Sequence, residues 1–207
     1  TTPGVWNLEL DLDEPMYFAA GSAEKRYWIG LTAATTGSNP IGWTALTYTD
    51  DGSNLPVHYS SDGGVTWSTT IPGADGLIEA SVKVMGTCEE VEVEDPEDPE
   101  DPDESYPCDQ SYGGVGEYSS PIGVSDVQDN ISAIDIVLEP GVSFLVERLK
   151  VNVSTSSMPF GLSYAATFYD EELGEQLGTS SLTITNGSAT TPGVWNLELD
   201  LDEPMYF

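Results

Sequence analysis

Apolar and polar residues alternate along much of this chain with the two-residue period of half-buried β-strands. In residues 6–13, WNLELDLD, the tryptophan and leucines are expected to face one way, while Asp11 and Asp13 are expected on the polar, solvent-facing side. The same alternation, or a short apolar run, predicts further strands at 27–34, 78–84, 134–138, 143–148, 149–153, 162–168, 181–185 and 195–202.

Residues that favour turns separate these segments. The predicted turns are Asp50-Asp51-Gly52, Asp62-Gly63-Gly64, Pro72-Gly73, Pro140-Gly141 and Asn186-Gly187. No stretch has the helical period beyond a single turn near residues 170–172. Many short strands with such punctuation predict an all-β protein, built as an antiparallel β-sandwich of jelly-roll or immunoglobulin-like type.

The chain contains one long internal duplication. Residues 1–18 read TTPGVWNLELDLDEPMYF, and residues 190–207 read the same eighteen letters. Identity over eighteen positions is not a chance event, and self-similarity at a fixed, domain-sized period predicts modules in tandem. The period is 189 residues, from residue 1 to residue 190. An engineered duplication is the alternative origin of the same pattern.

Residues 89–107, EEVEVEDPEDPEDPDESYP, carry eleven carboxylates, spaced prolines and no basic residue. This composition predicts a stiff, extended linker, because the prolines restrict the backbone and like charges repel. The sequence therefore divides into residues 1–88, the C-terminal half of one sandwich repeat, and residues 108–207, the N-terminal half of the next. The acidic, proline-rich linker is expected to join them.

The overall charge excludes several classes of partner. With 36 acidic and 5 basic residues, the chain has a formal net charge of −31. Nucleic acid and anionic membranes bind through lysine and arginine, so neither is an expected partner. No run of about 18 apolar residues is present, so no membrane insertion is predicted. The surplus of carboxylates makes a divalent cation the natural counter-charge.

Candidate catalytic groups are few. The segment SSDGGVTW, residues 60–67, matches the Asp-box pattern of sialidases, but this pattern describes a structural hairpin in which Asp62 binds turn amides, Gly64 takes an unusual φ and Trp67 anchors the corner. His58 is the one histidine and has no nucleophile in a recognisable arrangement. The sequence thus predicts a protein that is not an enzyme and requires no cofactor.

Two weaker patterns suggest ligands. Trp28, Trp43 and Tyr48 could form a platform for stacking sugars, and Trp43 in the loop-like stretch TTGSNPIGWTALT is the preferred contact; packing in the core is the alternative for each. Calcium is the candidate cation for the acidic residues, because it prefers carboxylate oxygens. Its candidate ligands are Asp95, Asp98, Asp101, Asp103, Asp11 and Asp13, and the alternative is that they are simply solvated.

Cys88 and Cys108 flank the linker. Pairing them with each other would close the linker into a loop, which a stiff anionic segment resists. The expectation is therefore that each cysteine bonds to a cysteine of its own module outside these 207 residues, clamping module start to module end.

Several segments together resemble a known class of proteins: YPCDQSYGGVGEYSS, IDIVLEPGVSFLVERLKVNV, ATFYDEELGEQLG, YWIGLTAATT, YSSDGGVTWS and VKVMGTC. They resemble the β-sandwich modules of very large, repetitive surface proteins of Bacteroidetes, which include gliding-motility adhesins exported by type IX secretion. The resemblance implies extracellular display at the cell surface, with neighbouring identical repeats as partners. It implies a structural or adhesive repeat of a long filament or stalk, acting in gliding motility or attachment. A carbohydrate-binding repeat that engages surface polysaccharide is the alternative.

Overall fold

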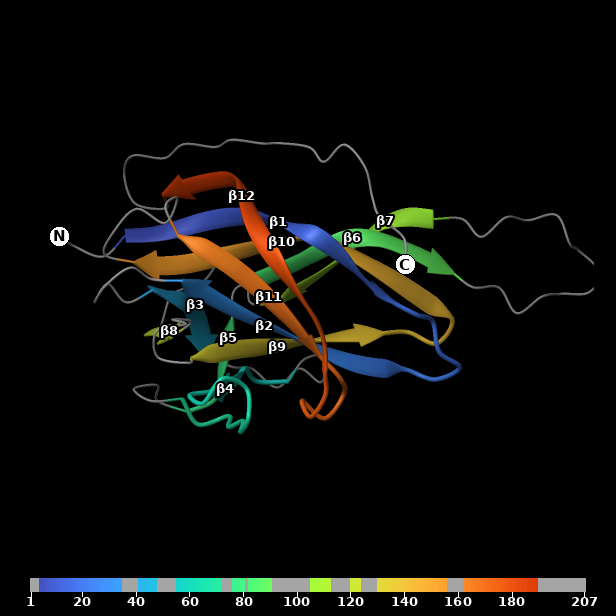
Figure 1. The fold of residues 1–207 in the computed structure, drawn as a ribbon, viewed down its shortest axis with the longest axis horizontal. Helices are drawn as coiled ribbons and strands as arrows, with labels where there is room; N and C mark the ends of the chain where they lie inside the picture. The colour runs from blue at the N-terminus through green and yellow to red at the C-terminus, as the bar shows by residue number, and fades with distance from the viewer. Residues whose placement is uncertain are drawn as a thin grey trace, which may run out of the picture.

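The fold was derived from a computed structural model of the chain. The structure describes residues 4–34, 41–47, 55–71, 76–80, 82–90, 105–112, 120–123, 130–155 and 162–189. Every regular element in these ranges is a β-strand (Figure 1). The strands are β1 (Gly4–Phe18), β2 (Lys25–Ala34), β3 (Ile41–Thr47), β4 (His58–Ser60), β5 (Ile78–Ala80), β6 (Val82–Glu90), β7 (Ser105–Tyr112), β8 (Ser120–Gly123), β9 (Ile131–Leu138), β10 (Val142–Thr155), β11 (Ser163–Tyr169) and β12 (Gln176–Ala189).

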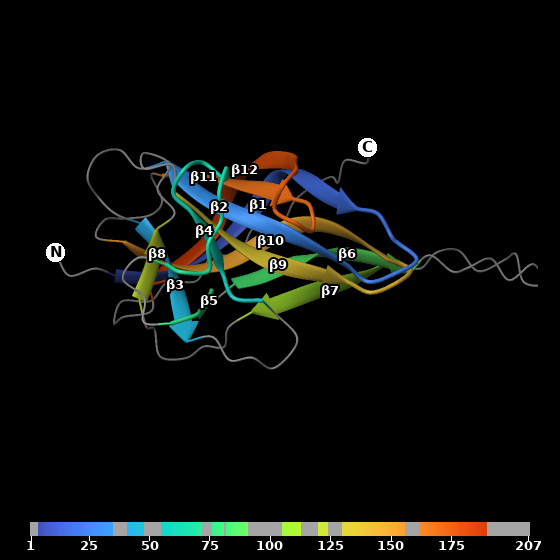
Figure 2. The same ribbon diagram turned by 90° about the horizontal axis from the view of Figure 1, so that it is seen from below.

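All these strands belong to one antiparallel sheet that curls around its core (Figures 1 and 2). The order along the main path is β4-β9-β2-β11-β12-β1-β10-β3-β5. Strand β6 pairs with β10 and β7, and β8 pairs with β3. The all-β, antiparallel class predicted from the alternation is confirmed.

Strands from both sides of the acidic segment, the predicted linker at residues 89–107, alternate in this sheet. Strand β1, from the start of the chain, lies between β10 and β12, and β2 lies between β9 and β11. The described residues before and after this segment therefore build one hydrophobic core together. Whether the parts before and after the acidic segment belong to one module or to two successive modules stays a prediction. In both cases, one copy of each part is needed to complete a module.

The core follows the predicted alternation closely. Leu8, Leu10 and Leu12 of β1 are almost completely buried, and they pack with apolar residues of the neighbouring strands. Phe18, at the end of β1, stacks on Tyr27 with ring centroids 4.5 Å apart and meets the edge of Phe168. Burying a large apolar side chain in this way stabilises the fold by about 1.5–3 kcal/mol relative to exposure.

Two local predictions are wrong. The stretch around Trp43 was expected to be loop-like, but Ile41–Thr47 forms β3, paired with the end of β10 and with β5 and β8. Asn186-Gly187 was expected to be a turn, but both residues lie inside β12, next to a register shift in its pairing with β1. Pairing on two sides in β3, and pairing with β1 at Asn186 and Gly187, outweighs the local preference of glycine and asparagine for turns.

Candidate functional site: the closed base of the acidic segment

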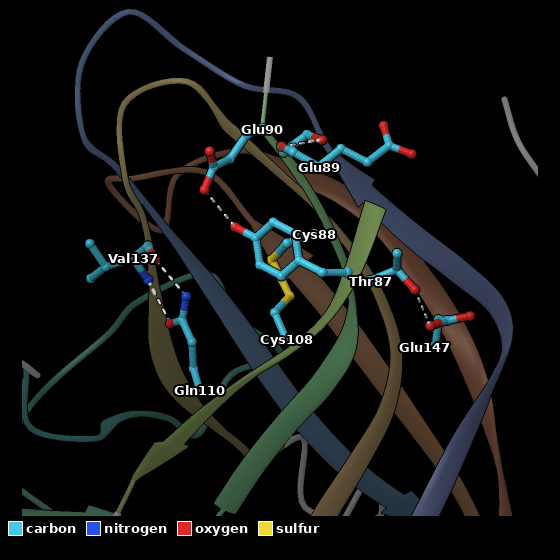
Figure 3. The surroundings of a disulfide bond; sticks show 10 residues. Thr87, Cys88, Glu89, Glu90, Cys108, Gln110, Val137 and Glu147 are labelled. Carbon is cyan, nitrogen blue, oxygen red and sulfur yellow. Dashed lines mark hydrogen bonds between the residues drawn. A yellow bond between two sulfur atoms is a disulfide. The ribbon is translucent and has the colours of Figure 1, made fainter. Parts of the chain in front are cut away.

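The two ends of the acidic segment leave the sheet side by side. Strand β6, which leads into it, and β7, which follows it, pair antiparallel from Glu89 opposite Ser105 to Val82 opposite Tyr112. Cys88 and Cys108 are bonded to each other across this pair, with their Cα atoms 5.7 Å apart (Figure 3). The base of the segment is therefore closed twice, by backbone hydrogen bonds and by a covalent bond.

This disulfide corrects the expected pairing, in which each cysteine bonded within its own module. That expectation treated the whole of residues 89–107 as a rigid spacer that keeps the sulfur atoms apart. Instead, backbone pairing extends to Glu89 and Ser105, so the ladder itself brings the two strands together. Repulsion between the carboxylates then acts on the residues beyond this base and does not oppose the bond.

Side chains hold both strands of the base in place (Figure 3). The amide of Gln110 on β7 accepts a hydrogen bond from the backbone nitrogen of Val137 at 3.0 Å and donates one to the carbonyl oxygen of the same residue. The Gln110 amide thus satisfies both backbone polar groups of Val137, as a neighbouring strand would do. On the other strand, Thr87 donates to the carboxylate of Glu147 at 3.1 Å.

The most exposed contact of the base joins Tyr106 to Glu90, with the tyrosine hydroxyl donating to the carboxylate at 3.3 Å (Figure 3). Desolvation raises the pKa of Tyr106, and the negative charge of Glu90 raises it further. The hydroxyl therefore stays protonated and able to donate over the whole neutral range.

A pocket of about 420 Å³ opens beside the disulfide, lined by Lys83, Met85, Gly86, Pro107, Cys108, Asp109, Glu147 and Arg148. Its charged groups already have partners in the fold. Lys83 pairs with Asp109 at 2.7 Å, and Arg148 pairs with Asp11 on β1. The cysteine is oxidised and Glu147 accepts from Thr87. The lining thus offers ion pairs that fix strands, and no group poised for nucleophilic or acid–base chemistry.

Asp11 lies on the face that the alternation predicted, but it is not exposed to solvent there. Its side chain is 2% exposed, and its carboxylate accepts hydrogen bonds from the guanidinium of Arg148, the residue directly opposite on β10. The neighbouring Glu9 pairs with Lys150, again directly opposite. A buried carboxylate that is saturated by arginine is a poor calcium ligand, so the proposed Asp11–Asp13 cation site is not assembled.

Of the remaining calcium candidates, the structure describes Asp13 alone. Asp13 is exposed and accepts a hydrogen bond from Thr183 at 2.8 Å. Asp95, Asp98, Asp101 and Asp103 lie outside the described residues. Within the described ranges, no group of three or more His, Cys, Asp or Glu side chains could hold a metal ion.

Of the three aromatic residues predicted to stack sugars, Trp28 is the one whose side chain the structure describes. Trp28 is 2% exposed; its indole N–H donates to the carbonyl oxygen of Glu171, and its ring meets that of His58 with centroids 4.3 Å apart. Trp43 contributes its backbone to β3, and Tyr48 lies outside the described residues. Core packing, the alternative reading, is the correct one for Trp28.

His58 is a packed side chain in this arrangement. Its Nδ1–H donates to the carbonyl oxygen of Pro56 at 3.0 Å, and desolvation lowers the pKa of the ring. The Asp135 carboxylate forms an ion pair with Arg26 and accepts a hydrogen bond from the backbone nitrogen of Leu55. Its negative charge raises the pKa of His58 and so partly opposes the effect of desolvation. The imidazole is thus neutral at neutral pH and faces an aromatic ring in place of a substrate cleft.

The Asp-box hairpin is confirmed as a structural turn. Asp62 accepts hydrogen bonds from the backbone nitrogen and the hydroxyl of Thr66, at 2.9 and 2.7 Å. Gly64 has φ of +88°, and Trp67 packs edge-on against Tyr169 with centroids 5.2 Å apart. The bonds from Thr66 and Ser60 lower the pKa of Asp62 to about 2.

No protein-family model, curated protein or solved structure matches this chain. Among the described residues, there is no helix long and apolar enough to cross a membrane. The functional interpretation therefore depends on the fold and on the closed base of the acidic segment.

Proposed function

We propose that this chain is a non-enzymatic structural repeat of a long extracellular surface protein, in which β-sandwich modules alternate with acidic spacers as a stalk or adhesive filament. The observation that carries the proposal is the position of the duplicated segment. Its first copy forms β1, a strand paired on both sides in the centre of the sheet. A duplication that includes a core strand at a 189-residue period is what successive copies of the whole fold would produce.

The closed base gives such an array a mechanical property. If the acidic segments connect successive modules, tension enters a module at the position of Cys108 and leaves it at the position of Cys88. In this chain the disulfide joins Cys88 to Cys108 across the acidic segment. In the array, the two ends of one module would supply the same pair of strands, so the bond would join Cys108 to the cysteine one 189-residue period after Cys88. The load would pass through a covalent bond and would bypass the hydrogen bonds of the sheet, so that modules stay folded under tension.

Charge and redox chemistry support the same reading. A net charge of −31 makes copies repel one another, which favours an extended and soluble polymer over a collapsed one. A disulfide at the base of the spacer is stable in oxidising surroundings such as the cell exterior. Four of the five basic residues form cross-strand ion pairs, which leaves the outer surface strongly acidic.

Single-molecule stretching of a recombinant chain of three consecutive 189-residue repeats tests the proposal. With the disulfides intact, we expect the spacers to extend without release of folded modules. After reduction, each module should unfold in a separate step that releases about 170 residues, or roughly 580 Å at about 3.4 Å per residue. The Cys88→Ser/Cys108→Ser variant, substituted in every repeat, is the matched control and should show the steps without reductant.

Imaging of the same three-repeat chain gives an independent result. We expect evenly spaced globular particles joined by thin segments of about 43 Å, the length of residues 91–104, beyond the paired base, at about 3.1 Å each. A single compact particle, or identical stretching curves before and after reduction, would overturn the proposal. Saturable binding to a polysaccharide would instead favour the carbohydrate-binding alternative.

A further inference from the structure

The position of β1 in the sheet makes specific demands on the strand that occupies it. Its apolar face requires leucines at the positions of Leu8, Leu10 and Leu12, which are 0–1% exposed. Its other face requires acidic groups, because Arg148 and Lys150 of β10 lie directly opposite Asp11 and Glu9. Few sequences combine three buried leucines with two carboxylates at these alternating places.

Residues 190–207 meet every one of these demands, because they repeat residues 1–18 letter for letter. Leu197, Leu199 and Leu201 are the counterparts of the three buried leucines, and Glu198 and Asp200 are the counterparts of the two paired carboxylates. Residues 190–207 are not among the described residues. Their sequence alone qualifies them for the position.

The register of β12 shows that this second copy can reach the position. In the sheet, Trp6 of β1 lies opposite Ala189, the last residue of β12. The counterpart of Trp6 is Trp195, so the second copy would take the same register after a loop of five residues, 190–194. Antiparallel strands are commonly joined by loops of two to five residues, and Pro192-Gly193 supplies turn-forming residues within this loop.

We propose that the position between β10 and β12 accepts either copy of the duplicated segment, and that residues 195–207 enter it as a hairpin with β12 when residues 1–18 leave. The two copies make the same buried contacts, so their competition depends on their connections. Residues 1–18 are attached to β2 through residues 19–24, and the second copy is attached to β12 through residues 190–194. Loops of six and five residues differ little in closure entropy, so neither copy has a large advantage from its connection.

This exchange matters for the tandem array, a consequence that rests on the proposed function. A module closed by the 190–194 hairpin receives its central strand from the adjoining polypeptide on its C-terminal side. The exchange moves residues 1–18 alone, so β6, β7 and the disulfide still close the base of the acidic segment. The same fold can thus be closed through either connection, and tension or crowding could convert one closure into the other without loss of buried contacts.

Charge substitutions in the two copies of the full 207-residue chain test the proposal. Leu10→Asp disables the first copy, Leu199→Asp disables the second, and the double variant disables both. We expect each single variant to keep a cooperative thermal transition within a few degrees of the parent chain. The double variant should lose at least about 10 °C or have no cooperative transition, because neither strand can then bury its leucines. Leu177→Asp, at a residue 39% exposed on β12, controls for the added charge.

Hydrogen exchange read by mass spectrometry shows which copy occupies the position, because the substitution gives the two otherwise identical segments different masses. In Leu10→Asp, residues 195–207 should be protected and residues 1–18 should exchange at the rate of unfolded chain. The proposal is overturned if Leu10→Asp is as unstable as the double variant, or if its folding requires dimerisation seen by sizing at increasing concentration. Either result is obtained with a single repeat and leaves the tandem, load-bearing role to its own stretching experiment.

Discussion

Cys88 and Cys108 are separated by 20 positions in the sequence, yet their Cα atoms lie 5.7 Å apart in paired strands at the base of the acidic segment. The relationship links two features that the sequence presents separately, a charged spacer and a pair of cysteines. Because the strands on either side of the spacer are already paired, the bond adds a covalent closure to an existing ladder. Its removal should therefore weaken the fold without abolishing it.

The Cys88→Ser/Cys108→Ser variant tests the strength of this closure. The disulfide restricts the unfolded chain by closing a loop of about 20 residues. Removing it should therefore lower the free energy of unfolding by about 3 kcal/mol. Denaturant unfolding monitored by tryptophan fluorescence measures the change, and the parent chain in reductant should give the same midpoint as the variant. A midpoint unchanged by either treatment would show that the backbone ladder alone closes the base.

Gly86→Ala should destabilise the same region for a steric reason. A Cβ atom at Gly86 would lie 1.8 Å from the carbonyl oxygen of Leu145, at the place where the pairing of β6 with β10 shifts register. Relieving that clash requires movement of backbone, which we expect to cost about 3 kcal/mol of unfolding free energy. Gly174→Ala is the matched control, because the atom nearest to a Cβ there, an oxygen of Asp170, is 3.9 Å away. Thermal melting of the two variants should separate them clearly.

The strands could be predicted from the sequence because alternation reports directly on burial. Residues 27–34 and 162–168 were predicted as strands, and they form most of β2 and β11. The order of strands could not be predicted in this way, since the period of a strand does not identify its neighbours. The pairing of β6 with β7 is such a non-local fact, and the wrong cysteine assignment followed from not knowing it.

Asp11 shows a second limit of the same reasoning. A two-residue period assigns a charged residue to the outer face, and Asp11 does lie on the opposite face from Leu10 and Leu12. That face is covered at this point by the Arg148 side chain, so the carboxylate is buried in an ion pair. Only the cross-strand register, with Arg148 directly opposite, identifies the pair. The available signal was the excess of acidic over basic residues. With 36 acidic and 5 basic residues, each basic residue has many carboxylates with which it could pair.

Arg148→Met should lower the free energy of unfolding, because Asp11 would then be buried without its partner. The substitution keeps an unbranched apolar stem but leaves the Asp11 carboxylate without its cation, which typically costs about 3–5 kcal/mol for a buried pair. Because Arg148 is 21% exposed, we expect the lower end of this range. Adding Asp11→Asn and Asp200→Asn to Arg148→Met should recover part of the loss, since no unpaired charge then remains in either copy. Urea unfolding of both variants measures the difference, and equal stability of Arg148→Met and the parent chain would contradict the assigned ion pair.

The Asp62 turn should carry a pH dependence of its own. Its hydrogen bonds to Thr66 and Ser60 lower the pKa of the carboxyl from 3.8 to about 2. A lowered folded-state pKa means that the contribution to stability is complete above the unfolded value and is lost as the pH falls from about 4 to about 2. The amide resonance of Thr66, which donates to Asp62, should therefore shift in an NMR titration with a midpoint near pH 2. Asp62→Asn should remove that titration, whereas a midpoint near 3.8 in the parent chain would show that the carboxylate is not held by the turn.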